Sequence, residues 1–204
     1  MDARRCGIEK VDVLDGGIGY LKLTGFADLA PCEAHAMAAM DSLAMARSLI
    51  IDLRENKGGS PQMISYIASY LFDQRTHLND LWERPSGRTV EFWTRDSVPG
   101  RRFGGKKPIY VLTSSRTFSG GEEFTYDLQA LKRAVVVGER TAGGAHLTAP
   151  RRLDDHFTVS VPFARAINPL TRANWEGVGI APTVDATAEE ALQIALARLR
   201  DGRR

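Results

Sequence analysis

Ser119 is a candidate nucleophile in the segment SSRTFSGGEEF at 114–124. It stands between an apolar, strand-like segment and a segment with the pattern of a helix. At such a junction the free N–H groups of the first helical turn can stabilise negative charge that develops when a hydroxyl attacks a carbonyl. The simpler interpretation is a capping box, in which Ser119 caps the helix and Glu122 bonds back to the backbone of Ser119.

The two glycines after the serine favour a close approach at this junction. Gly120 and Gly121 fall in the first helical turn, where each costs up to about 1 kcal/mol relative to alanine. Glycine is expected where a ligand or a second backbone must come near. The sequence therefore leaves capping and nucleophilic chemistry open together at Ser119.

A second loop of the same kind occurs at 49–61, LIIDLRENKGGSP. Its glycines, Gly58 and Gly59, follow an apolar run, and ligands of open α/β sheets bind at the carboxyl ends of the strands. One of these amides together with that of Gly120 could form an oxyanion hole. The alternative is a tight turn held by an Asp52–Arg54 pair.

The surrounding elements predict an α/β fold with a mixed sheet. Apolar runs at 49–53, 108–113 and 134–138 are typical of strands buried on both faces, and helical patterns separate them. Turn residues at 15–17 and 85–87 predict additional hairpins.

Composition bounds the function classes. The chain has 204 residues, 43% of them hydrophobic, and a net charge of +2, which favours one soluble domain and gives no electrostatic basis for binding nucleic acid. No apolar run approaches a membrane span and the N-terminus lacks a signal pattern, so a cytoplasmic protein is expected, with a periplasmic or secreted one open if a leader is missing. Cys6 and Cys32 are expected as free thiols. Neither metal-ligand spacing nor a phosphate-binding loop is present, so no metal or cofactor is expected.

Four segments, taken in order, resemble one family. They are DLRENKGG (52–59), TSSRTFSGGEEF (113–124), VVGERTAGGA (136–145) and NWEGVGIAPTVD (174–185). They are similar to the tail-specific, or C-terminal processing, serine peptidases, in the branch with the tricorn core and the interphotoreceptor retinoid-binding protein. The resemblance covers 18–198 and implies one catalytic domain over 1–204. Residues 1–17 would be a lead-in and 199–204 a basic tail. The implied fold is a ClpP/crotonase-like core of βαβ units.

The resemblance also implies roles for individual residues. Ser119 would be the nucleophile of peptide-bond hydrolysis, and Gly120 with Gly58 or Gly59 would form the oxyanion hole. Glu176 would orient the hydroxyl network. The implied substrates are peptides or unfolded protein ends, and a homo-oligomer is compatible with the family.

The general base is the open question. One branch of the family places a lysine where Gly144 stands, and the tricorn-like branch uses a histidine, usually in an Asp-Gly-His segment well upstream of the DLR strand, which is not found here. His146 is the best local substitute, while His35, His77 and His156 are expected to be structural or exposed. Two alternatives to an active peptidase follow: a binding module for apolar ligands or peptides, and a catalytic fragment that lacks its upstream histidine.

Overall fold

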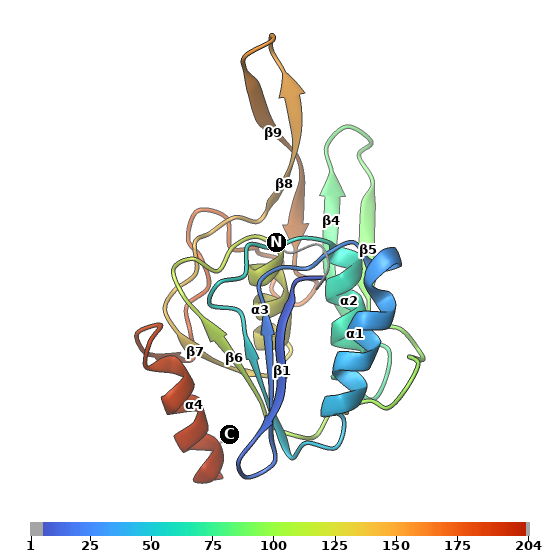
Figure 1. Ribbon diagram of the computed structural model, residues 1–204. Coiled ribbons are helices and arrows are strands. Elements are labelled where there is room, and N and C mark those ends of the chain that lie inside the picture. Colours follow the sequence, from blue (N-terminus) through green and yellow to red (C-terminus); the bar gives the residue numbers. More distant parts are fainter. Residues whose placement is uncertain (1–5, 203–204) are drawn as a thin grey trace.

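The computed structural model describes residues 6–202 and folds them around two sheets and four helices (Figure 1). The first five residues of the expected lead-in and the last two of the expected tail lie outside the described residues. The strands are β1 Ile8–Leu14, β2 Ile18–Leu23, β3 Ser48–Asp52, β4 His77–Glu83, β5 Thr89–Trp93, β6 Ile109–Thr113, β7 Val135–Gly138, β8 His146–Arg152, β9 Thr158–Ile167 and β10 Val184–Asp185. The helices are α1 Leu29–Leu43, α2 Pro61–Ser69, α3 Gly120–Ala130 and α4 Ala191–Arg200.

The main sheet has the strand order β1-β2-β3-β6-β7-β10. Only β1 runs antiparallel to its neighbour, so the predicted mixed α/β sheet is confirmed. Every residue of β3 and β6 is buried, because α1, α2 and α3 pack on one face of the sheet and α4 on the other. Because β3 and β6 run parallel, their carboxyl ends lie at the same edge of the sheet, and so do the two glycine loops that follow them.

A second sheet, ordered β5-β4-β9-β8, is antiparallel throughout. The hairpin of β4 and β5 was predicted. The strand β8 was not, because Pro150 and the arginines that follow it obscure the alternating pattern. Beyond its pairing with β4, the β8–β9 hairpin extends away from the rest of the molecule (Figure 1).

The two cysteines correct a prediction. Cys6 and Cys32 form a disulfide between the segment before β1 and the start of α1, with their Cα atoms 5.6 Å apart. The prediction of free thiols was wrong because two cysteines carry no spacing signal, and only the packing of α1 beside β1 brings them together.

In the part of the chain that the structure describes, no helix is both long enough and apolar enough to cross a membrane.

Candidate active site

Ser119 occupies a left-handed backbone conformation at the junction of β6 and α3. Its φ and ψ are 53° and −119°, a region that a residue with a side chain enters at a cost of about 1–3 kcal/mol. The Glu122 half of the predicted capping box is present as well: the Ser119 N–H donates to Glu122 Oε2 at 2.8 Å. The two interpretations of the sequence are therefore compatible, because the box holds the serine in a strained turn of the kind seen at nucleophile elbows.

The glycines of the two loops lie in direct backbone contact. A Cβ atom on Gly58 would come within 2.7 Å of both Ser119 Cβ and Gly120 N, and one on Gly120 within 2.9 Å of Gly59 N. The Gly58 N–H donates to the buried Asn56 Oδ1 at 2.8 Å. The N–H groups of Gly59 and Gly120 have no acceptor among residues 6–202. Two unpaired backbone donors therefore lie beside Ser119.

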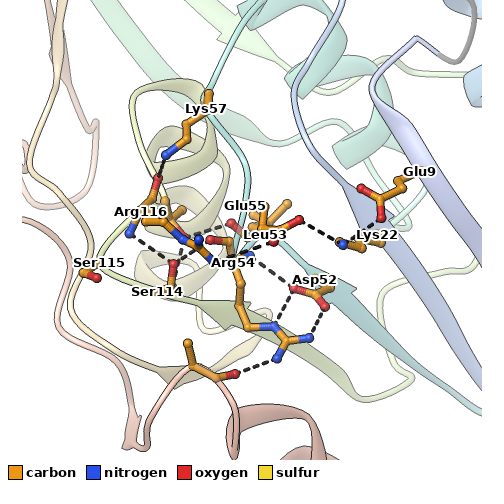
Figure 2. Close-up of polar contacts among 12 residues, drawn as sticks. Glu9, Lys22, Asp52, Leu53, Arg54, Glu55, Lys57, Ser114, Ser115 and Arg116 are labelled. Carbon is orange, nitrogen blue, oxygen red and sulfur yellow. Dashed lines mark hydrogen bonds and ion pairs between the residues drawn. The ribbon is translucent and has the colours of Figure 1, made fainter. Parts of the chain in front are cut away.

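Side chains bond the two loops to each other across their whole length. Figure 2 shows Lys57 beside Arg116 and Ser114 beside Arg54. These contacts are Thr117 Oγ1 to Leu53 O at 2.8 Å, Ser114 Oγ to Arg54 O at 2.5 Å and Lys57 Nζ to Arg116 O at 3.0 Å. The ammonium group of Lys57 thus links the two loops.

A buried ion pair anchors the start of the first loop. The Asp52 carboxylate accepts from Arg54 and from the Tyr20 hydroxyl at 2.6 Å, and Arg54 also donates to Ala188 O at the approach to α4. Burial on its own raises the pKa of Asp52, but the bonds from Arg54 and Tyr20 outweigh it and bring that pKa below its ordinary value. The structural role that the sequence suggested for Asp52 and Arg54 is confirmed.

Glu122 is the hub of the site, and sequence reasoning missed this. Besides Ser119, its fully buried carboxylate accepts from Thr141 Oγ1 at 2.6 Å, from Gly143 N at 2.6 Å and from Gly144 N at 2.8 Å. The capping-box pattern was the available signal, but the pattern does not reveal the distant partners. The glycine turn at 141–144 is thereby fixed against the strained serine.

Glu176 and His146 meet next to that turn. The Glu176 Oε2 atom accepts from Ala145 N at 2.6 Å and His146 N at 3.1 Å, and its other oxygen lies 3.7 Å from His146 Nδ1. Both side chains are partly exposed. The structure thus brings together two candidates that are 30 positions apart in the sequence. His146 comes two residues after Gly144, whose N–H bonds to Glu122.

Phe118 fills the space next to Gly144. A Cβ atom built on Gly144 would come within 2.3 Å of the Phe118 ring. The position that carries a lysine in one branch of the family is therefore closed to any side chain unless Phe118, which is 43% exposed, moves outward.

Trp175 and the other histidines occupy packing or surface positions. Trp175 is buried and donates to Gly144 O at 3.0 Å, so it packs beneath the turn. His77 pairs with Asp80 at 2.7 Å, while His35 and His156 are exposed, as expected. Among the described residues no group of three or more His, Cys, Asp or Glu side chains is arranged to hold a metal ion.

Two further carboxyl groups are buried along α3. Glu123 and Asp127 are one helical turn apart, and the buried Asn79 side chain lies beside Glu123. Burial raises the pKa of Glu123 to about 7 and raises that of Asp127, which also feels the charge of Glu123. The helix that begins at the candidate nucleophile therefore contains a pair of acids that resist ionisation.

A strained serine at a strand-to-helix junction, with unpaired amides beside it, is the geometry of a nucleophile elbow on an α/β sheet. The sequence model of the family "Peptidase family S41" matches residues 17–186, and the chain belongs to that family.

Relatives share this region at moderate identity. Tricorn protease homolog 2 of Streptomyces coelicolor is 28% identical over 184 residues, which cover 87% of this chain and 14% of that protein. Carboxyl-terminal-processing peptidase 1 of Arabidopsis thaliana is 29% identical over 177 residues, covering 86% of this chain and 35% of the relative. The chain thus spans about a third or less of the length of these relatives.

Solved structures support the fold. The photosystem II D1 C-terminal processing protease superposes with a TM-score of 0.68 at 23% identity, over 90% of this chain and 47% of that one. The tricorn protease superposes with a TM-score of 0.62 at 21% identity, over 92% of this chain and 18% of that one.

Proposed function

We propose that this chain is a serine-type peptidase domain that hydrolyses peptide bonds in peptides or unfolded protein ends. The observation that carries the proposal is the left-handed Ser119 beside the unpaired amides of Gly59 and Gly120. In this proposal Ser119 Oγ attacks the scissile carbonyl and forms an acyl-enzyme, which water then hydrolyses.

The two amides stabilise the tetrahedral oxyanion. Of the two alternatives from the sequence, Gly59 is favoured over Gly58, because the Gly58 N–H already donates to Asn56. Gly59 and Gly120 are packed closely enough that both donors are fixed before substrate binds, which is the condition for strong electrostatic stabilisation. Loss of one donor is expected to cost about 3 kcal/mol of transition-state stabilisation.

His146 is the proposed base, and Glu176 is its positioning residue. Glu176 faces the Nδ1 side of the imidazole, which leaves Nε2 to accept the proton of Ser119 and to return it to the leaving amine. The distance of 3.7 Å between Glu176 Oε1 and His146 Nδ1 is within reach of an ion pair and longer than a hydrogen bond.

A hydrolysis assay tests the proposal. An unfolded, carboxymethylated protein is incubated with the chain and with its Ser119→Ala variant, and new peptides are identified by mass. Cleavage is expected only with the parent. Ser115→Ala is the matched control, because Ser115 is an exposed serine four residues earlier on the same loop and its loss should leave cleavage unchanged.

A chemical rescue tests the role of His146. His146→Ala should abolish cleavage, and added imidazole should restore part of it, since a free base can occupy the vacated space. Full activity of His146→Ala would assign the base to a group other than His146 while leaving the role of Ser119 intact.

A further inference from the structure

The outer part of the β8–β9 hairpin, residues 148–162, stands clear of the body of the protein and is called the arm below (Figure 1). β4 pairs with β9 only at residues 164–167, so the strands of the arm pair with each other alone. A two-stranded ribbon is marginally stable in water. The arm would therefore gain stability from any partner that covers it.

One face of the arm is apolar. The register sets Ala149 opposite Val161 and Arg151 opposite Val159, and Leu153 N donates to Phe157 O at the tip. Because side chains alternate along a strand, Ala149, Arg151, Val159 and Val161 share a face. Leu153 and Phe157, which directly follow β8 and precede β9, close the same row at the tip. We call this face the apolar stripe: Ala149, Leu153, Phe157, Val159 and Val161. Leu153 and Phe157 are 69% and 66% exposed, and Val159 and Val161 are each 41% exposed.

The same face is buried nearer the body. Leu147 lies two positions before Ala149 on β8, and it packs with Ala164, Ala166 and Trp175 in a core cluster. The stripe is thus the continuation of a core-facing surface beyond the point where the body covers it. The opposite face of the arm carries the polar set Thr148, Arg152, Thr158 and Ser160, with Pro150 and Pro162.

Prolines limit the extension of the sheet along either edge of the arm, since Pro150 on β8 and Pro162 on β9 have no N–H to offer. A partner that covers the stripe would present a surface that is apolar and of similar width. A second arm of the same sequence meets both conditions, since two such faces can stack as sheets do, about 10 Å apart.

The charges of the arm are complementary to those of a second copy. Arg151 lies between the stripe residues on the same face, and its side chain makes no ion pair or hydrogen bond within residues 6–202. Asp154 and Asp155 lie at the tip, the first bonded to the N–H groups of its own turn and the second paired with Arg152. Two arms with overlapping tips would place each Arg151 near the tip carboxylates of the other copy.

We propose that the apolar stripe is a homodimer contact, in which two copies pack stripe to stripe around a twofold axis with Arg151 of each facing the tip carboxylates of the other. The contact is small compared with a typical interface, so the dimer is weak, with a dissociation constant roughly in the micromolar range.

Sedimentation equilibrium of the oxidised chain over a wide range of concentration tests this proposal. A reversible monomer–dimer equilibrium is expected. Val159→Glu should weaken the dimer by at least about tenfold, because it places a charge within the stripe. Ser160→Glu is the matched control: the same side chain on the adjacent, opposite face should leave the equilibrium unchanged. Circular dichroism confirms that both variants are folded.

A charge exchange tests the pairing itself. Arg151→Glu should weaken the dimer, and Arg151→Glu combined with Asp155→Arg should restore it. A parent chain that stays monomeric at every concentration overturns the proposal. So does equal weakening by Val159→Glu and Ser160→Glu. A monomer in which Val159→Glu reduces only the binding of an unfolded polypeptide would also overturn it, and would assign the stripe to substrate.

Discussion

The Glu122 carboxylate holds the N–H of Ser119 at 2.8 Å and, through the same oxygen, the N–H of Gly144 at 2.8 Å. A helix cap thereby becomes the joint between the strained serine and the turn that leads to His146. The site depends on this joint, because the left-handed conformation of Ser119 persists only if its surroundings enforce it.

Glu122→Gln should therefore destabilise the fold. An amide in place of the carboxylate presents its NH₂ group to at least one backbone donor and leaves that donor unpaired. The expected loss in free energy of unfolding is about 2–4 kcal/mol, measured by denaturant titration. Glu189→Gln, at an exposed glutamate, is the control and should change stability by less than about 0.5 kcal/mol. A change in Glu122→Gln as small as in the control would contradict the role of Glu122 as the joint.

Gly144→Ala should lower the stability of the protein because of the Phe118 ring. The new Cβ overlaps the ring, which must rotate outward at an expected cost of about 1–3 kcal/mol. In a Phe118→Ala background the same substitution should cost close to nothing. Denaturant titration of the four proteins in this cycle gives the coupling energy, and additive effects would mean that the two residues do not compete for space.

Removal of the disulfide should lower stability without removing the fold. Its closure of a 26-residue separation predicts a loss of about 3 kcal/mol in Cys6→Ala/Cys32→Ala, by the chain-entropy model. Addition of dithiothreitol should produce the same loss in the parent and none in the double variant. An identical parent stability with and without the reductant would show that the cysteines are not paired in solution.

The acids of α3 predict a pH dependence with a definite sign. The folded-state pKa of Glu123 is about 7, above its ordinary value of 4.5, so the folded state retains a proton that the unfolded state releases. Stability from this group is fully present below about pH 4.5 and is lost as the pH rises toward 7.

Glu123→Gln removes this titration. The stability difference between variant and parent should shift in favour of the variant by about 2–3 kcal/mol between pH 4.5 and 7.5, measured by denaturant titration across that range. The pKa of Asp127 is raised as well, so its effect on stability has the same sign. A stability difference that moves in favour of the parent as the pH rises would refute the burial of Glu123 as an acid.

Local patterns predicted much of this fold. The turn residues at 15–17 join β1 and β2 in a hairpin as expected, and the buried runs form β3, β6 and β7. Local patterns also found Ser119, because the strand, the serine, the glycines and the helix are neighbours in the chain. The contacts between distant segments could not be predicted in this way, since no periodicity records that Glu122 reaches the turn at 141–144 or that Cys6 reaches Cys32.

The pairing of His146 with Glu176 illustrates the same limit. The sequence offered both residues as candidates, but it did not predict β8, the strand that begins at His146. Only the packing of the 174–179 loop against the glycine turn, with Gly177 N donating to Gly143 O at 2.9 Å, sets the two side chains next to each other.

The most direct test of the central claim is intact-mass detection of fluorophosphonate labelling of the oxidised chain. One adduct per chain is expected at Ser119, with none on Ser119→Ala and slow labelling of His146→Ala. Absence of an adduct on the parent, in a sample shown to be folded by circular dichroism, would contradict the claim that this chain activates its own serine.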